Sequence, residues 1–288
     1  MQRLIASFLA GLLVAPVFAH SSDPGRKARQ TLETAMADNN PDHRKEAVIA
    51  LSLIGPGSDA LKLLTDALAA DKDVDVRVAA CASLAETKDS RAIEPLLKAL
   101  NDETPEISFG AAKALFVLGD PTGKAVILDV LGKEKKTSSG LITKEKRDAL
   151  RMLKTPGVLF KMAAKEGLGM VPLPGLGIGI ASAQAIMNDS GVSSRSLVAL
   201  MLAKETDEES LKALRDAIYD SDWSVRAAAI HSLALRDKPE IKDDLVLLFD
   251  DKKIAVRYRA AAAYLRLDQL SKEPHSTSQP SQTGKPRR

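Results

Sequence analysis

The chain carries a helical motif that returns every 31 residues. The segments DHRKEAVIALSL, DVDVRVAACASL, TPEISFGAAKAL, DWSVRAAAIHSL and KIAVRYRAAAAY align without gaps. Their fifth positions fall in one column, 31 residues apart within each run: Glu46, Arg77 and Ser108, then Arg226 and Arg257, with Arg195 standing 31 residues before Arg226 in the same column. A unit of this length cannot bury its own apolar face and must stack on its neighbours. The repeat therefore predicts an all-α solenoid.

Each unit is predicted to be a helix hairpin. In the second helix, residues four places before the column are suited to N-caps: Asp42, Asp73, Thr104 and Asp222. Apolar residues follow the column at three places (Ile49, Ala80, Ala111, Val198, Ala229, Ala260) and at seven places (Leu53, Leu84, Leu115, Leu202, Leu233, Tyr264). These spacings share one helical face, where Ala permits close approach. First helices are expected at 24–38, 58–70, 90–100, 121–132, 207–220 and 239–251.

The repeat is interrupted between Ser108 and Arg195. A loop at 132–140 and an extra helix within 155–169 account for the excess and place Lys146 in the column. About seven units result. We expect N-terminal repeats at 20–154, an apolar Gly/Pro-rich insertion with the first helix of unit five at 155–190, C-terminal repeats at 191–270 and a disordered tail at 271–288.

The pattern D-x-x-V-R-x-x-A-x-x-x-L is complete in residues 73–84 and 222–233. It resembles the HEAT repeat, in particular the short bacterial type named after phycobilisome lyases. The resemblance implies a right-handed α-solenoid with the second helices on its concave side. It also implies that the column arginines, which are Arg77, Arg195, Arg226 and Arg257, bond acidic groups or helix ends of the adjacent unit. Glu46, Ser108 and Lys146 depart from this column, which predicts an interrupted ladder in the N-terminal half.

Residues 1–19 have the form of a secretory signal. Arg3 precedes a short apolar stretch from Leu4 to Val17, and small residues precede the expected cleavage after Ala19. We therefore expect export to the periplasm or secretion. Cys81 is the single cysteine, so no internal disulfide can form, and its alanine neighbours predict a place in the core.

The residue types that carry chemistry are sparse. The 41 basic and 38 acidic residues nearly balance, which argues against nucleic-acid binding. The chain has four histidines and lacks the H-E-x-x-H, G-x-S-x-G and C-x-x-C motifs. We expect no catalytic residue, cofactor or metal, and a partner that is another protein. Candidate protein-binding residues, expected to be exposed, are Trp223, His231, Tyr258 and Arg259.

One segment leaves alternatives open. The run Gly167 to Met187 contains no charge and includes the small-residue stripe Gly175, Gly179 and Ala183. It can be a closely packed first helix of unit five, or an element that contacts a membrane peripherally, although Pro172 and Pro174 interrupt it. The chain is accordingly predicted to be an exported, non-catalytic scaffold. The alternatives are a membrane-peripheral scaffold that docks through 156–188 and an accessory factor of an enzyme or chromophore-lyase system.

Overall fold

The computed structural model of the chain describes residues 23–57, 59–131 and 193–272. In these ranges the regular elements are all helical. The first helices of the hairpins are α1 (Pro24–Met36), α3 (Ala60–Ala70), η2 (Ser90–Ala92) with α5 (Ile93–Ala99), α7 (Pro121–Leu131), α12 (Glu208–Ala217) and the 3₁₀ helix η5 (Pro239–Asp250). The second helices are α2 (Pro41–Leu51) with η1 (Ser52–Ile54), α4 (Val74–Glu86), α6 (Pro105–Val117), α11 (Ser194–Met201) with η4 (Leu202–Lys204), α13 (Trp223–Ala234) and α14 (Ile254–Lys272).

Several predictions fall outside the described residues. They are the signal sequence at 1–19, the unit with Lys146, the insertion at 155–190 with the segment Gly167 to Met187, and the tail beyond Lys272.

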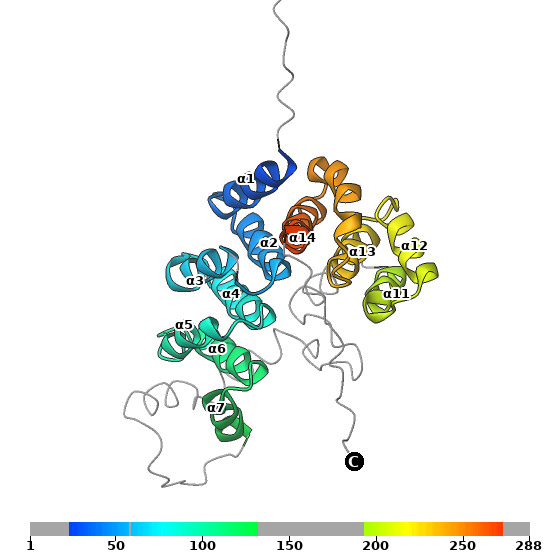
Figure 1. Cartoon of the computed structure of the whole chain (residues 1–288). Coiled ribbons are helices and arrows are strands. Elements are labelled where there is room, and N and C mark those ends of the chain that lie inside the picture. Colours follow the sequence, from blue (N-terminus) through cyan, green and yellow to red (C-terminus); the bar gives the residue numbers. More distant parts are fainter. Residues whose placement is uncertain (1–22, 58, 132–192, 273–288) are drawn as a thin grey trace, which may run out of the picture.

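The helices form two layers along a curved array, with first helices outside and second helices inside (Figure 1). The sequence explains this division. First helices such as α1 and α12 bury one apolar stripe, whereas α2, α13 and α14 bury residues on nearly every side. A helix that is apolar all round is stable only between neighbours. The prediction of an all-α array of hairpins is therefore confirmed.

The two apolar columns of the repeat form the core. Ala80, Ala111, Ala229 and Ala260 are fully buried, and so are Leu84, Leu115 and Leu233. Val198 departs from its column, because its side chain is 55% exposed. It lies on α11, which is the last second helix of the described array and packs on α13.

The N-caps follow the repeat in three of the four predicted cases. Asp73 accepts hydrogen bonds from the amides of Asp75 and Val76, and Asp222 accepts one from Ser224. Thr104 is the N-cap of α6, although its side chain makes no capping bond. The prediction for Asp42 is wrong. Asn40 caps α2 and accepts from the Asp42 amide, because this helix begins two residues early, at Pro41.

A left-handed residue follows the second helix in four described units, and in the first of them Gly55, with a φ of 92°, is left-handed as well. Gly57, Lys88, Gly119 and Asp237 have φ values of 77°, 56°, 79° and 52°. All four stand eleven residues after the column. Glycine adopts this conformation freely, whereas a residue with a Cβ does so at a cost of about 1 kcal/mol. Lys88 and Asp237 are thus held in an unfavourable conformation by the turn.

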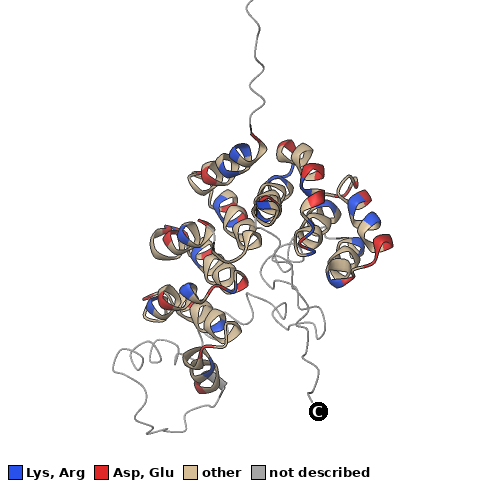
Figure 2. Ribbon diagram, in the orientation of Figure 1, with Lys and Arg blue, Asp and Glu red and all other residues tan. Residues whose placement is uncertain are grey.

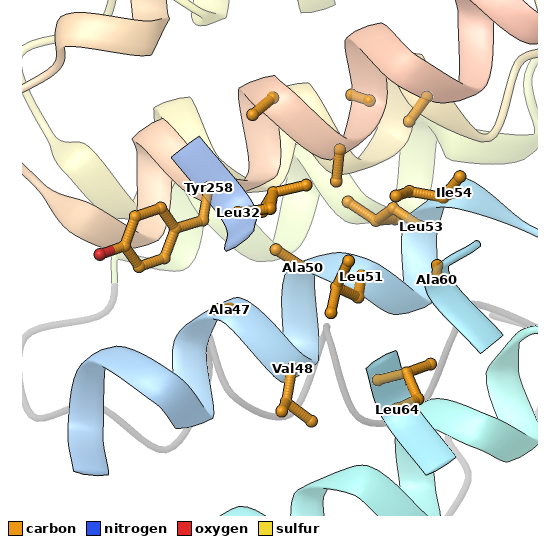
Figure 3. Close-up of a cluster of buried hydrophobic side chains, with 14 of the residues drawn as sticks. Leu32, Ala47, Val48, Ala50, Leu51, Leu53, Ile54, Ala60, Leu64 and Tyr258 are labelled. Atoms are coloured by element: carbon orange, nitrogen blue, oxygen red, sulfur yellow. The ribbon is translucent and has the colours of Figure 1, made fainter. Parts of the chain in front are cut away.

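The spatial order of the units differs from their order in the chain. The C-terminal helix α14 packs against α13 and η5, and its other side packs against α1, α2 and η1 (Figure 1). We call this junction of the two ends of the chain the seam. Leu32 of α1 and Ala47 of α2 lie beside Tyr258 of α14 in the buried apolar cluster of the seam (Figure 3). The seam makes the N-terminal and C-terminal repeats one continuous array.

Candidate interaction surface

A ladder of arginine–aspartate pairs connects successive units. Arg226 donates two hydrogen bonds to Asp251, at 2.8 and 2.9 Å, and Arg77 and Arg195 pair with Asp102 and Asp220. Each acceptor lies 25 residues after its arginine, in the turn before the next second helix. The bonds to acidic groups of the adjacent unit, implied by the HEAT resemblance, are therefore present for these three arginines. Arg257 donates instead to the carbonyls of Asp251 and Lys252.

The aspartates of the ladder also order the turns in which they lie. Asp71, Asp102, Asp220 and Asp251 each accept a hydrogen bond from the amide two residues later. Such a side chain stabilises a turn and is preferred there for that reason. The Arg44 guanidinium, together with the amide of Asp73, holds the pKa of the Asp71 carboxyl below its ordinary value. The same carboxylate thus fixes a turn and joins two units.

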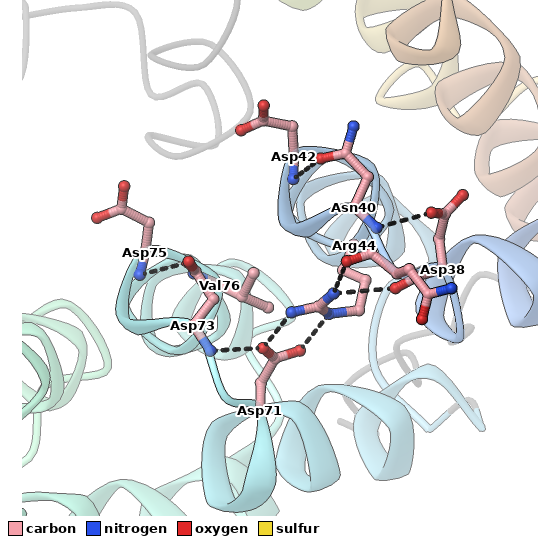
Figure 4. Close-up of polar contacts among 9 residues, drawn as sticks. Asp38, Asn40, Asp42, Arg44, Asp71, Asp73, Asp75 and Val76 are labelled. Atoms are coloured by element: carbon pink, nitrogen blue, oxygen red, sulfur yellow. Dashed lines mark hydrogen bonds and ion pairs between the residues drawn. The ribbon is translucent and has the colours of Figure 1, made fainter.

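The predicted interruption at unit one is wrong. Arg44, two residues before Glu46, donates two hydrogen bonds of 2.8 Å to Asp71 (Figure 4). The early start of α2 explains the offset, because Arg44 stands four residues after the Asn40 cap, as Arg77 does after Asp73. At Ser108 the arginine is replaced by a hydroxyl, which donates to the carbonyl of Leu100 at 2.7 Å.

The expected exposure of His231, Tyr258 and Arg259 is wrong, since their exposed fractions are 1%, 6% and 1%. Tyr258 and Arg259 lie in the seam, where Arg259 donates to Glu46 at 2.9 Å and to the carbonyl of Ala255 at 3.0 Å. Tyr258 and Arg259 are covered by α1 and α2, and the helical pattern of the last unit does not indicate that these helices pack against it. Trp223 is half-buried, and the Lys253 ammonium lies 5.8 Å from the centre of its ring.

His231 is an unusual core residue. Both ring nitrogens are buried and lack a hydrogen-bond partner among the described residues. Burial, with the nearby charges of Arg259 and Arg266, lowers the pKa of His231 to about 3. The ring is therefore neutral at physiological pH. It contributes neither a charge nor an accessible nitrogen to the surface.

The inner layer is open to solvent at α11, where Val198 and Met201 are 55% and 58% exposed, and along a strip on α4 and α6. We define the inner strip as the residues that α4 and α6 present on the side opposite Leu84 and Leu115: Asp75, Val78, Ala82 and Glu86 on α4, and Glu106, Phe109, Lys113, Phe116 and Val117 on α6. Phe116 and Val117 are 50% and 51% exposed, and the Lys113 ammonium lies 5.0 Å from the centre of the Phe109 ring. Val78 and Ala82 on α4, and Phe109 and Lys113 on α6, stand one and five residues after the column. The residues at these two positions are buried in the other described second helices: Ala47 and Leu51, Ser196 and Leu200, Ala227 and His231, Tyr258 and Ala262.

Within the described residues, no three side chains among His, Cys, Asp and Glu lie together as metal ligands would. Cys81 is buried as predicted, and burial raises the pKa of its thiol to about 12. None of the helices in these ranges combines the length and the apolarity that crossing a bilayer requires. Basic and acidic residues are interspersed along the helices of the array (Figure 2).

Comparisons with solved structures return several chains with low sequence identity to this one. Human deoxyhypusine hydroxylase in complex with glycerol is 19% identical, with 87% of this chain and 98% of that chain covered and a TM-score of 0.32. A designed armadillo repeat protein is 15% identical, with 85% and 100% covered and a TM-score of 0.27. An engineered protein is 16% identical, with 84% and 97% covered and a TM-score of 0.26. Comparison with curated proteins gives no match.

The sequence profile of HEAT repeats matches residues 14–77, 61–138 and 181–266. These matches cover more than half of the chain and include the hairpins described above. The chain belongs to the HEAT-repeat family.

Proposed function

We propose that the protein is an interaction scaffold that binds another protein along the inner strip. The observation that carries the proposal is the exposure of Phe116 and Val117 on a rigid inner helix. Val78 and Ala82 of α4, which stand 31 residues before Phe109 and Lys113 of the same strip, are half-buried rather than covered. Large apolar side chains held open on an ordered surface are a feature of binding sites, and repeat proteins use the surface formed by successive units in this way.

The composition of the strip indicates the kind of partner. Asp75 and Glu106 stand in the first turns of α4 and α6, and Glu86 ends α4. Two aromatic rings and several small aliphatic side chains follow along the strip, with Lys113 between Phe109 and Phe116. An amphipathic helix or an extended segment with apolar anchors and flanking basic residues would complement this surface. The scaffold is non-catalytic in this proposal, which is supported by the buried state of Cys81 and His231.

Two finer assignments belong to the same proposal. The complete motifs at 73–84 and 222–233 support repeats of the short bacterial type named after phycobilisome lyases. The composition of residues 1–19 supports export, and N-terminal sequencing of the mature protein tests it.

Site-specific photo-crosslinking tests the binding surface. A photoreactive residue at position 116 should give a discrete adduct with a partner in the native compartment. The control is the same residue at Leu247 of η5, which is 74% exposed but lies in the outer layer. Phe116→Glu should abolish the adduct formed from position 109 without changing the circular dichroism. Equal adducts from positions 116 and 247, or capture unaffected by Phe116→Glu, would contradict the proposal.

A further inference from the structure

A basic pocket lies at the seam, on the edge of the array where the second helices end. Its volume is about 410 Å³, which is within the range of small-molecule sites. The turns after α4, η4 and α13 form its walls together with Arg266 of α14. Because α4 belongs to the N-terminal repeats and the other elements to the C-terminal repeats, the pocket exists only when the seam is closed.

Positive charge dominates the lining. The basic side chains are Lys88, Lys204, Arg236, Lys238 and Arg266, whereas the acidic ones are Glu205 and Asp237. This excess of three charges in one concavity equals the formal net charge of the entire chain, +3. A concave surface with an excess of one sign focuses the field and concentrates ions of the opposite sign.

Two of these cations are held in position by hydrogen bonds to other parts of the chain. Arg236 donates to the carbonyl of Leu202 at 3.0 Å, and its buried Nε has no partner among the described residues. Arg266 donates to the carbonyl of Leu53 at 3.1 Å and to Asp237 at 2.7 Å. The carbonyl acceptors orient both guanidinium groups without cancelling their charge, whereas Asp237 compensates part of the charge of Arg266. Both arginines are therefore arranged before a ligand arrives, which reduces the entropy that binding would cost.

The charge of Lys238 is only weakly compensated within the protein. Lys238 pairs at 3.1 Å with Glu208, whose side chain is 83% exposed, so this contact exchanges readily with solvent. Planar guanidinium groups bind phosphate and carboxylate oxygens in pairs, and ammonium groups add point charges around them.

We propose that the pocket binds a small polyvalent anion, in which phosphate or carboxylate groups contact Arg236 and Arg266 and reach Lys88 across the seam. Such a ligand contacts both halves of the chain. It therefore stabilises the closed array, because it binds the folded seam and not the open one. The proposal does not depend on the inner strip, which lies on α4 and α6.

The left-handed turns supply a matched pair of variants. Lys88→Gly and Asp237→Gly both replace a residue of positive φ by glycine at equivalent turns, so both should retain the fold. Their charge effects are opposite, because one removes a cation from the pocket and the other an anion. Lys98→Ala, on the outer helix α5, controls for loss of a surface lysine.

Isothermal titration calorimetry of the full chain at constant ionic strength measures the binding. Inorganic pyrophosphate and citrate are the probes, and chloride is the reference. We expect saturable 1:1 binding of at least one probe, weakened about tenfold in Lys88→Gly. Binding should be unchanged in Lys98→Ala and at least as tight in Asp237→Gly. Preference for pyrophosphate or for citrate identifies a phosphorylated or a polycarboxylate ligand.

Two results would overturn the proposal. One is the absence of saturable binding of both probes to the wild-type chain. The other is equal weakening in Lys88→Gly and Asp237→Gly, which would show that turn conformation rather than charge controls the affinity.

Discussion

At the scale of single residues, position in a column does not determine what a side chain does. Glu46 stands in the column of the ladder arginines but pairs with Arg259, while Arg44 carries the ladder. His231 occupies the same position as Leu51 and Leu200, and all three are buried. The histidine is thus a polar residue in a site that accommodates leucine elsewhere in the array.

Replacing His231 tests this interpretation. His231→Leu should stabilise the fold by about 1 kcal/mol or more at pH 7, because it removes a buried polar group without partners. The gain should grow as the pH falls. The unfolded chain protonates this ring below its ordinary pKa of about 6.5, whereas the folded chain does so only near a pKa of about 3.

The wild-type chain should therefore lose up to about 1.4 kcal/mol per pH unit between these values, a loss that His231→Leu abolishes. Urea unfolding at pH 7 and pH 5 measures both stabilities. If the difference between variant and wild type is the same at the two pH values, the ring is not held neutral by burial.

At the scale of elements, the distance between neighbouring helices is set by small residues. Gly110 in α6 and Gly123 in α7 differ in whether the packing leaves space for a Cβ atom. A Cβ at Gly110 would lie 3.6 Å from Cys81, an ordinary contact. A Cβ at Gly123 would lie 2.3 Å from the backbone nitrogen of Phe116. The second glycine is required by the close approach of α7 to α6, whereas the first is not.

These distances predict opposite effects for the same substitution. Gly110→Ala should stabilise the fold by about 0.5–1 kcal/mol, because glycine in a helix interior is entropically unfavourable. Gly123→Ala should destabilise it by about 1–3 kcal/mol, since the backbone must move. Thermal unfolding followed by circular dichroism compares them. Destabilisation by both variants to a similar extent would contradict the described packing of α6 on α7.

At the scale of the whole molecule, the seam joins helices from the two ends of the chain. Arg259 is fully buried there, and its guanidinium bonds Glu46, whose side chain is 23% exposed. Removing one partner from a buried ion pair leaves the other charge uncompensated, which costs more than the loss of a surface pair. The seam should accordingly be sensitive to changes on either side of it.

Glu46→Gln tests the coupling. We expect a loss of about 1–3 kcal/mol, discounted for the partial exposure of Glu46. Hydrogen exchange should accelerate in α1, α2 and α14 together. Glu94→Gln, which alters an exposed pair with Lys98, is the control and should change exchange in none of these helices. Faster exchange confined to α2 would show that the two ends of the chain do not stabilise each other.

Local periodicity in the sequence determined the helical elements of this protein and the faces that they bury. The 31-residue spacing predicted the hairpins, the buried alanine and leucine columns and two of the capping aspartates, because each of these depends on residues within one helix or its immediate turn. The aspartates of the ladder also repeat in the sequence, at 71 and 102 and at 220 and 251, but aspartate is common in turns for local reasons, so its spacing alone does not predict an ion pair.

Tertiary structure decided how the two ends of the array meet. A repeat pattern specifies that each unit stacks on a neighbour, but it does not say that the last unit stacks on the first. That contact between α14 and α1–α2 buries Tyr258 and Arg259 and gives Glu46 its partner. It also brings Lys88 to Arg266, so the basic pocket could not be found from spacing. Such features depend on pairing of surfaces distant in the chain, which local helical patterns do not encode.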